Sequence, residues 1–387
     1  MNGKTLPPKL GRLAVSTLLC LCVAAVIAMP ARALETSAKQ AILIDIETGT
    51  VLLEKNADEP VPPSSMSKMM TVYVVFERLK EGMLSLSDTF VVSRKAWKRG
   101  GSKMFVEVGK SVSVGDLLRG VIVQSGNDAA IVLAEGLAGD EKAFADRLNE
   151  KAKELGLTNS HFKNASGWPE DGHLMSVRDI ARLSINTIRK FPELYKIYAE
   201  KTFTFSGIRQ GNRNPLLYKN IGADGLKTGH TESAGYGLSA SAVRDGRRLV
   251  LVLNGLPSMR ARSTESHRLM SWGFREFRNF SLYGKGDEVA TADVWLGAEE
   301  TVPLVIDRDL KVTLPRGARK KASVKVVYTG PIPAPIAKDA EIAHLEITAS
   351  NIEPIKIPLK AGKGVERLGF MGRVSAGLSY LLWGTLK

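Results

Sequence analysis

The sequence predicts a fold of the mixed α/β class, more narrowly α+β, with helices packed on one antiparallel sheet and a smaller all-β domain behind it. Strand-like runs stand near both ends of residues 34–280, and helix-like stretches fill the middle. After residues 269–277 the pattern changes to short β-rich runs separated by glycine and proline. A chain of 387 residues has room for two such domains.

The first 33 residues have the pattern of a secretory signal peptide. Lys4, Lys9 and Arg12 form a basic start, residues 13–28 form an apolar core, and residues 31–33 have the small-x-small form of a cleavage site. The apolar run is short for a spanning helix, although an uncleaved anchor is the alternative. We therefore expect an exported chain from which these residues have been removed.

The cysteine count and the charge narrow the chemistry of the mature chain. Cys20 and Cys22 both lie in the apolar core, so no cysteine is left for a disulfide, a nucleophile or a metal site. Loss of residues 1–33 removes four basic residues and no acidic ones, which lowers the formal net charge from +14 to +10. Lys/Arg runs interleaved with aromatic residues are absent, so we expect an anionic membrane or wall polymer as partner and no nucleic acid.

The elements of the domain predicted over residues 34–280 follow in chain order. Residues 41–56 indicate a hairpin around Glu47-Thr48-Gly49, and a second hairpin is centred on Arg244-Asp245-Gly246. A double proline followed by serines is typical of a helix start. The predicted helical stretches are 65–80, 114–155 and 176–199, and the strands of the second hairpin are 236–243 and 247–255.

The C-terminal part is predicted to hold a β-sandwich-like domain over 281–362 and an amphipathic helix over 363–387. Runs such as 322–328 and 355–361 indicate the strands. One face of the helix is apolar and the other carries Arg373, Tyr380 and Lys387. Four glycines weaken this helix in water, so we expect it to bind a membrane surface, with docking on the protein itself as the alternative. The apolar face comprises Leu368, Met371, Val374, Leu378, Leu381 and Leu382.

Ser65 and Lys68 stand three residues apart at the start of the first predicted helix, so they share one helical face. The positive end of the helix dipole and burial among methionines both favour the neutral form of Lys68. A neutral lysine is able to take the proton of a serine hydroxyl. Alone, the pair is as typical of a capping serine with a surface lysine, and Ser160 and Lys163 have the same spacing.

Two further motifs change this interpretation. Ser125-Gly126-Asn127 enters a predicted helix, and Lys227-Thr228-Gly229 opens a strand, where glycine lets a ligand approach the backbone closely. Each is weak alone, because residues 184–186 also read S-x-N and Lys227 could be a surface lysine. In the order S-x-x-K, S-x-N, K-T-G, and in these contexts, the three are typical of active-site serine penicilloyl transferases.

On these residues the chain resembles the low-molecular-mass penicillin-binding proteins of the D-alanyl-D-alanine carboxypeptidase type. The likeness extends to the segments PPSSMSK, SGNDAA, DGLKTGHT and ESHRLMSWGF, the trailing β domain and the amphipathic tail. Against the usual P-A-S-[ML]-T-K pattern, Ser64 replaces alanine and Ser67 replaces threonine, and both changes are small. The resemblance implies a serine β-lactamase/DD-peptidase-like catalytic domain.

The resemblance also implies a role for each site residue. Ser65 would be the nucleophile, Lys68 the general base and Ser125 the group that relays a proton to the leaving amine. The backbone N–H groups of Ser65 and His230 would form the oxyanion hole. Arg213 and Arg262 match family arginines near the carboxylate site by position, although either could be a surface arginine. The residues expected to bind substrate are Asn127, Lys227, Thr228, Gly229, His230, Arg213 and Arg262.

The implied function is removal of the terminal D-alanine from peptidoglycan stem pentapeptides at the periplasmic face of the inner membrane, with penicillins as covalent inhibitors. A β-lactamase is one alternative, but the E-x-x-L-N pattern is absent around Glu170. A non-catalytic wall-binding protein is another, but binding alone has no use for a serine–lysine pair. No H-x-x-x-H pair, G-x-S-x-G elbow or phosphate loop is present, so no metal or organic cofactor is expected.

Overall fold

The computed structural model describes residues 35–318, 322–349 and 352–383, and the predicted signal peptide lies outside them. Residues Thr36–Lys387 form one compact unit. The mixture of helix and sheet confirms the α+β prediction.

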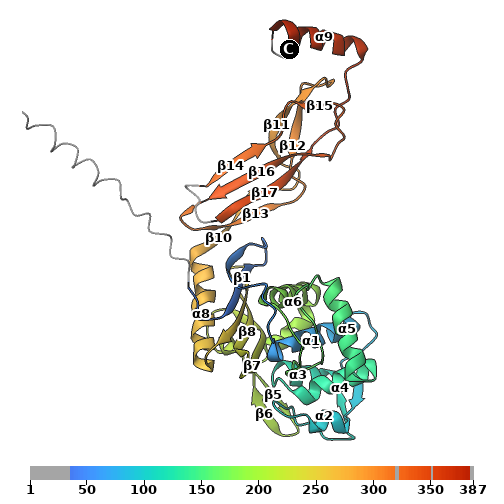
Figure 1. Cartoon of the computed structure of the whole chain (residues 1–387), viewed down its shortest axis with the longest axis vertical. Coiled ribbons are helices and arrows are strands. Elements are labelled where there is room, and N and C mark those ends of the chain that lie inside the picture. Colours follow the sequence, from blue (N-terminus) through green and yellow to red (C-terminus); the bar gives the residue numbers. More distant parts are fainter. Residues whose placement is uncertain (1–34, 319–321, 350–351, 384–387) are drawn as a thin grey trace, which may run out of the picture. The chain divides into compact units, whose positions relative to one another are not determined.

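A five-stranded antiparallel sheet, in the order β2–β1–β9–β8–β7, runs through the N-terminal part of this unit (Figure 1). Its β1–β2 and β8–β9 connections are the two predicted hairpins. The central strand β9 and its neighbour β1 are largely buried, as expected for strands that have both faces covered. The bounds are β1 (Gln40–Asp45), β2 (Val51–Lys55), β7 (Ala223–Thr231), β8 (Gly235–Arg244) and β9 (Arg247–Leu256).

Helices cover the two faces of this sheet. The long helix α8 (Met259–Glu276) packs against β8 and β9, while α6 (Val177–Lys190) packs against β1 and β9 from the other side (Figure 1). Beyond α6 lies α1 (Lys68–Lys80), which also contacts α3 (Val114–Ile122), α4 (Asn127–Ala138) and α5 (Glu141–Glu154). The sheet is therefore the middle layer of the N-terminal part of this unit.

Helix α1 is the predicted central helix. Every residue from Lys68 to Phe76 is buried, because helices and sheet surround the first turns. The structure differs from the prediction at the start of this segment. Ser64–Ser67 form a 3-10 turn, η1, and the α-helix begins only at Lys68. Ser64 takes a φ of 51°, so the chain enters the helix through a tight, left-handed residue after the two prolines.

Side-chain caps explain where several helices begin. Ser113, Asp140, Ser176 and Ser258 each accept a hydrogen bond from the backbone N–H three residues later, at the starts of α3, α5, α6 and α8. The shorter elements of this part complete the scaffold. They are α2 (Arg94–Lys98), α7 (Pro192–Tyr195), η2 (Lys196–Ala199), η3 (Pro215–Tyr218), β3 (Thr89–Val91), β4 (Ser111–Ser113), β5 (Thr202–Phe205) and β6 (Ile208–Gly211).

The C-terminal part is built from strands, as predicted, and has a hydrophobic core of its own. Six strands form one sheet in the order β14–β16–β17–β12–β11–β15, and β10 pairs with β13. Strand β10 follows α8 without a linker. The bounds are β10 (Phe277–Tyr283), β11 (Glu288–Trp295), β12 (Thr301–Val305), β13 (Leu310–Pro315), β14 (Ser323–Val327), β15 (Ile332–Pro333), β16 (Glu341–Ala349) and β17 (Ile352–Ala361).

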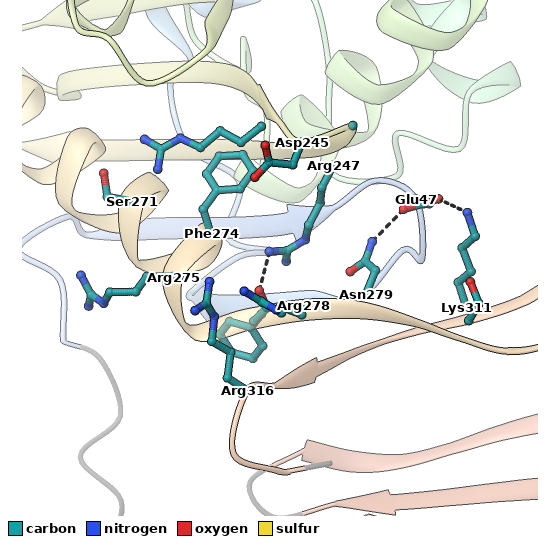
Figure 2. A pocket seen from close by; sticks show the side chains of 14 residues that line it. Glu47, Asp245, Arg247, Ser271, Phe274, Arg275, Arg278, Asn279, Lys311 and Arg316 are labelled. Carbon is teal, nitrogen blue, oxygen red and sulfur yellow. Dashed lines mark hydrogen bonds and ion pairs between the residues drawn. The ribbon is translucent and has the colours of Figure 1, made fainter.

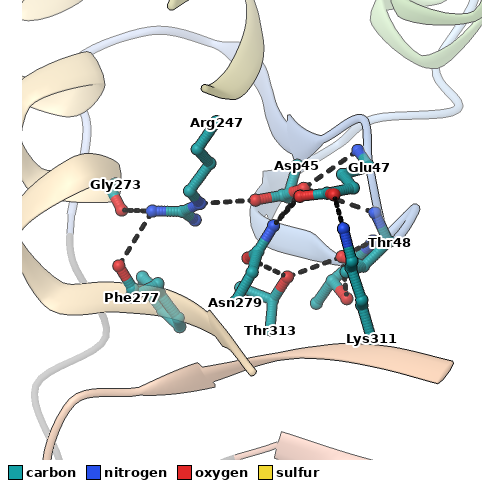
Figure 3. Close-up of polar contacts among 10 residues, drawn as sticks. Asp45, Glu47, Thr48, Arg247, Gly273, Phe277, Asn279, Lys311 and Thr313 are labelled. Atoms are coloured by element: carbon teal, nitrogen blue, oxygen red, sulfur yellow. Dashed lines mark hydrogen bonds and ion pairs between the residues drawn. The ribbon is translucent and has the colours of Figure 1, made fainter. Parts of the chain in front are cut away.

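Polar contacts join β10 and β13 to the turn between β1 and β2 (Figure 3). The buried Asp45 carboxylate accepts hydrogen bonds from Arg247 Nε at 2.6 Å and from Asn279 Nδ2 at 3.3 Å. Thr48 and Thr313 share a hydroxyl–hydroxyl bond of 2.5 Å. Asn279 and Thr313 thus hold β10 and β13 beside the β1–β2 turn.

The last described element is α9 (Phe370–Trp383), within the range predicted for the amphipathic tail. Apolar side chains of this helix are strongly exposed, including Met371 at 77% and Leu381 at 84%. No helix within the described ranges is both long and apolar enough to cross a bilayer.

Candidate active site

Ser65 and Lys68 meet where η1 passes into α1. Lys68 Nζ lies 2.9 Å from Ser65 Oγ, and the lysine is fully buried while the serine is partly exposed. Two further oxygens surround the same nitrogen: Asn127 Oδ1 at 2.7 Å and the backbone oxygen of Ser166 at 2.5 Å. The serine is thus open to a substrate, and the lysine behind it is shielded from water.

The protonation of Lys68 follows from these surroundings. Burial lowers its pKa to about 7, repulsion by Arg213 acts in the same direction, and Asp128 partly opposes both. A neutral amine has two N–H donors and one lone pair. The oxygens of Asn127 and Ser166 take the two donors, which leaves the lone pair for the hydroxyl proton of Ser65. The geometry therefore suits general-base activation of the serine.

This protonation makes the acylation rate depend on pH. Because the neutral form of Lys68 is the predicted base, we expect kcat/KM to fall about tenfold per pH unit below pH ~7 and to level off above it. The measurement is the second-order rate constant for acylation by a penicillin between about pH 5 and pH 9. A profile that stays flat through this range would exclude Lys68 as the titrating base.

A loop that follows α5 supplies part of this arrangement. Besides Ser166, which binds Lys68, the loop holds Gly167 in the left-handed region at a φ of 72°. A Cβ at Gly167 would lie 1.9 Å from the backbone oxygen of Ser64, so only glycine lets the loop approach the turn that carries Ser65. The loop and the serine turn are thus in direct backbone contact.

Gly167→Ala is expected to disturb both stability and acylation. The left-handed backbone alone costs an alanine about 1–3 kcal/mol, and relief of the clash must move Ser166 or Ser64. A shift of about 1 Å near the reacting groups lowers acylation about a hundredfold. The matched control is Gly139→Ala, which has the same left-handed strain at a φ of 83° but open space around the added carbon. Equal acylation by the two variants, measured with a penicillin, would contradict this role for Gly167.

Ser125 and Lys227 form the second polar pair of the site. Lys227 Nζ donates to Ser125 Oγ at 2.8 Å, and both residues are almost fully buried. Ser125 takes a φ of 60°, an uncommon value for a non-glycine residue, directly before Gly126 at the entry of α4. Burial lowers the pKa of Lys227 well below its usual value, and repulsion by Lys68, Arg213 and Arg262 adds to the effect.

The entry of α4 also carries Asn127 and Asp128. The Asn127 amide bridges two sides of the site: Oδ1 accepts from Lys68, and Nδ2 donates to the backbone oxygen of Gly100 at 2.9 Å. Asp128 is fully buried and accepts backbone hydrogen bonds from Met104 and Phe105, both at 2.9 Å. These bonds fix the segment around residues 100–106 beside the catalytic groups.

The structure brings Arg213 and Arg262 to the same site, where Arg262 is buried and Arg213 stays exposed to solvent. Burial lowers the pKa of both, and each contributes to the lowered pKa of Lys227. Arg213 Nη1 donates to Ser102 Oγ at 2.6 Å, whereas the buried Nε of Arg262 has no partner among the described residues. Together with Lys227 they make a positively charged region suited to a carboxylate.

The remaining predicted residues lie on β7. Thr228 is buried, and the exposed ring of His230 stacks on Tyr236 with 3.9 Å between centroids. Gly229 is also required within the chain itself. A Cβ there would lie 2.9 Å from the backbone oxygen of Pro63, so the glycine lets β7 approach the serine turn of the chain itself.

The sequence interpretation missed several residues at this site. Ser166 acts through its backbone oxygen, which no side-chain motif reveals. Asp128 follows Asn127 directly, yet its partners lie more than twenty residues earlier. The exposed Trp168 stacks on Arg99, whose guanidinium carbon is 5.3 Å from the ring centroid. Trp168 directly follows Gly167, and nothing in the sequence connects this loop with the three motifs.

The described residues contain no cluster of three or more histidine, cysteine, aspartate or glutamate side chains arranged to hold a metal ion. Glu170, the candidate base of the β-lactamase alternative, is exposed. Its carboxylate accepts a hydrogen bond from Asn164 Nδ2 at 3.0 Å.

Both parts of the chain match known protein families. A family profile described as D-alanyl-D-alanine carboxypeptidase matches residues 27–257, and one described as the C-terminal domain of penicillin-binding protein 5 matches residues 277–367. The D-alanyl-D-alanine carboxypeptidase DacC of Escherichia coli is 41% identical over 86% of this chain and 85% of its own length. DacA of the same organism is 38% identical over 88% and 86%.

Solved structures agree. Penicillin-binding protein 5 from Haemophilus influenzae superposes with a TM-score of 0.78 at 36% identity, covering 86% of this chain and 98% of that protein. The D-alanyl-D-alanine carboxypeptidase DacD from Francisella tularensis also gives a TM-score of 0.78, at 30% identity, over 90% and 98%.

Proposed function

Because this chain belongs to the D-alanyl-D-alanine carboxypeptidase family of penicillin-binding proteins, we propose a catalytic role for each residue of the Ser65 site. The protein is a serine-type D-Ala-D-Ala carboxypeptidase of the bacterial cell wall and binds β-lactams. The observation that carries the assignment of roles is the 2.9 Å contact between the accessible Ser65 hydroxyl and the fully buried Lys68 amine.

Acylation begins when neutral Lys68 accepts the Ser65 proton as Oγ attacks the carbonyl carbon between the two terminal D-alanines. The backbone N–H groups of Ser65 and His230 stabilise the oxyanion. Ser125, held by Lys227 at 2.8 Å, relays a proton to the departing amine, and the C–N bond breaks. Water then hydrolyses the ester on Ser65, which frees the shortened peptide and restores the hydroxyl.

Substrate binding uses the charge of the site. Lys227, Arg213 and Arg262 attract the terminal carboxylate of the peptide, and Thr228 donates a hydroxyl hydrogen bond to it. Asn127 keeps one N–H of its amide for the substrate backbone, since Gly100 takes the other. Gly229 keeps the strand close enough to Ser65 for both ends of the substrate to be held at once.

The direct test is to incubate the protein with a soluble peptide that ends in D-Ala-D-Ala and to measure released D-alanine. A reporter penicillin is applied in parallel. D-Alanine release with long-lived labelling of Ser65 supports the carboxypeptidase roles. Rapid turnover of the penicillin would favour a β-lactamase, and the absence of both reactions would favour a wall-binding protein.

We also propose that residues 1–33 direct export and that residues 363–387 attach the enzyme to the outer leaflet of the inner membrane. The catalytic domain would then span 34–280 and the β domain 281–362. Support for the tail comes from α9, where Met371, Val374, Leu378 and Leu381 are 44–84% exposed. Side chains that docked on the protein itself would be covered, whereas a membrane would bury this apolar face. The side chain of Leu382 and all of Lys387 lie outside the described residues.

Removal of the tail should separate membrane binding from catalysis. A truncation near Lys360 would cut β17, and Val365, only 2% exposed, packs in the core of the β domain, so the truncated protein should end at Gly369. We expect the full-length protein to sediment with anionic liposomes and the truncated protein to stay in solution. Both should release D-alanine from a soluble peptide at equal rates, because every residue assigned to catalysis or substrate binding precedes residue 263. Equal sedimentation of the two proteins would contradict the anchor. A parallel experiment with neutral liposomes measures how much of the membrane binding is electrostatic.

A further inference from the structure

We propose that a cavity beside the end of α8 binds an organic oxyanion that carries at least two phosphate or carboxylate groups. The cavity measures about 1040 Å³, is open to solvent on one side, and is lined by the β1–β2 and β8–β9 turns, the last turns of α8, β10, and β13 with the residues after it (Figure 2). None of the catalytic residues lines it. The only acidic residues in its lining are Glu47 and Asp245. Six cationic side chains line it, namely Arg244, Arg247, Arg275, Arg278, Lys311 and Arg316.

The protein neutralises only part of this charge. Lys311 pairs with Glu47 at 2.6 Å, and Arg275 pairs with Glu276 at 2.6 Å. Arg278 and Arg316, in contrast, make no side-chain hydrogen bond or ion pair with any residue that the structure describes. Two exposed arginines without partners are ordinary on an open surface. Here they lie at the edge of a concave region, where several like charges raise the local potential and attract anions.

Arg278 and Arg316 are positioned to act on one ligand. Arg278 lies on β10 and Arg316 directly after β13, and these strands pair in the register Arg278 opposite Leu314. The backbone N–H of Arg316 also donates to the oxygen of Glu276 at 2.8 Å, which fixes it next to the end of α8. Figure 2 shows the two guanidinium groups close together at the same side of the cavity. Such a pair matches the fork geometry with which arginine binds phosphate and carboxylate oxygens.

Arg247 supplies a third potential donor in the lining of the cavity. Arg247 is held by Asp45 through Nε and by the backbone oxygens of Gly273 and Phe277 through Nη1, but its Nη2 is buried without a partner in the described structure. A buried donor without an acceptor is costly, and an anionic oxygen would remove that cost. Nη2 has almost no accessible surface, so a small shift of the side chain has to accompany its contact with a ligand oxygen.

The size and the aromatic lining argue for an organic ligand rather than a simple ion. A single phosphate fills only a small part of about 1040 Å³, while cavities of this order hold whole small molecules. The ring of Phe274 lies between two guanidinium groups, 4.9 Å from that of Arg244 and 5.8 Å from that of Arg247. This sandwich keeps both side chains along the wall. The ligand therefore combines anionic groups with a carbon skeleton that contacts Phe274 or Phe277.

The test is calorimetric titration of the full-length protein with an organic bisphosphate, fructose 1,6-bisphosphate, and, separately, with citrate, at a constant ionic strength of about 0.15 M. The two probes decide between phosphate and carboxylate. The double variant Arg278→Gln/Arg316→Gln should bind the preferred probe at least about tenfold more weakly. Its matched control is Arg308→Gln/Arg367→Gln, which removes the same charge from exposed positions outside the cavity. The control should bind within about twofold of the unmodified protein.

Two results would overturn the proposal. One is the absence of binding of both probes to the unmodified protein. The other is an equal loss of binding in the two double variants, which would show attraction to the overall positive charge and no defined site. D-Alanine release from a soluble peptide verifies that each variant is folded, and it should be unchanged because neither pair belongs to the catalytic site.

Discussion

Ser65→Ala is expected to abolish both D-alanine release and covalent labelling by penicillin. Without Oγ no ester forms, and the described residues near Lys68 offer no second hydroxyl at comparable distance. The loss should be at least about a thousandfold, as for other serine nucleophiles. The side chain is small and partly exposed, so the melting temperature should change little.

The matched control is Ser160→Ala. Ser160 and Lys163 have the same S-x-x-K spacing, but Ser160 Oγ donates to Asp179 at 2.8 Å and takes no part in the Lys68 network. This variant should keep full labelling. Labelling of Ser65→Ala would show that another residue is the nucleophile, which a mass measurement on the labelled peptide would then identify.

Lys68→Arg should be nearly as damaging, although it conserves the charge. A guanidinium stays protonated at every accessible pH and has no lone pair to accept the Ser65 proton. It would also place a larger, permanent charge where burial already lowers the pKa of the lysine to about 7. We expect acylation to fall about a hundredfold to ten-thousandfold.

The measurement is the rate of acylation by a reporter penicillin, with the melting temperature recorded for the same sample. Lys163→Arg is the control, since Lys163 is exposed and belongs to the other S-x-x-K pair. Acylation of Lys68→Arg at the normal rate would rule out a general-base role for this residue. A folded variant that has lost acylation would support it.

Much of the fold could be predicted from local patterns. The two hairpins were marked by turn residues, and the near-continuous apolar run after Lys68 indicated a helix buried on all sides. The three motifs marked residues that the structure brings together, because each contributes a side chain at a fixed distance from a helix or strand start. Their mutual contacts, such as Lys227 with Ser125, follow from the family resemblance and not from spacing.

The rest depends on contacts that leave no local pattern. Ser166 contributes a carbonyl oxygen, a group that every residue carries, and it reaches Lys68 across 98 residues of sequence. Gly167 could be recognised as a glycine but not as one that faces Ser64, because the clash exists only in the folded chain. The 3-10 start of the first helix likewise depends on Ser64 adopting a positive φ, which residue type alone does not demand.

The crowding of Lys68, Lys227, Arg213 and Arg262 has a thermodynamic consequence. Folding brings these groups together and removes them from water. The free enzyme therefore carries a cost in charge repulsion and desolvation that the unfolded chain does not. In the proposed mechanism the substrate carboxylate is the counter-ion that reduces this repulsion. The free enzyme is thus less stable against unfolding than it would be without this charge cluster. The same unfavourable free energy is partly recovered when substrate binds, which increases the affinity.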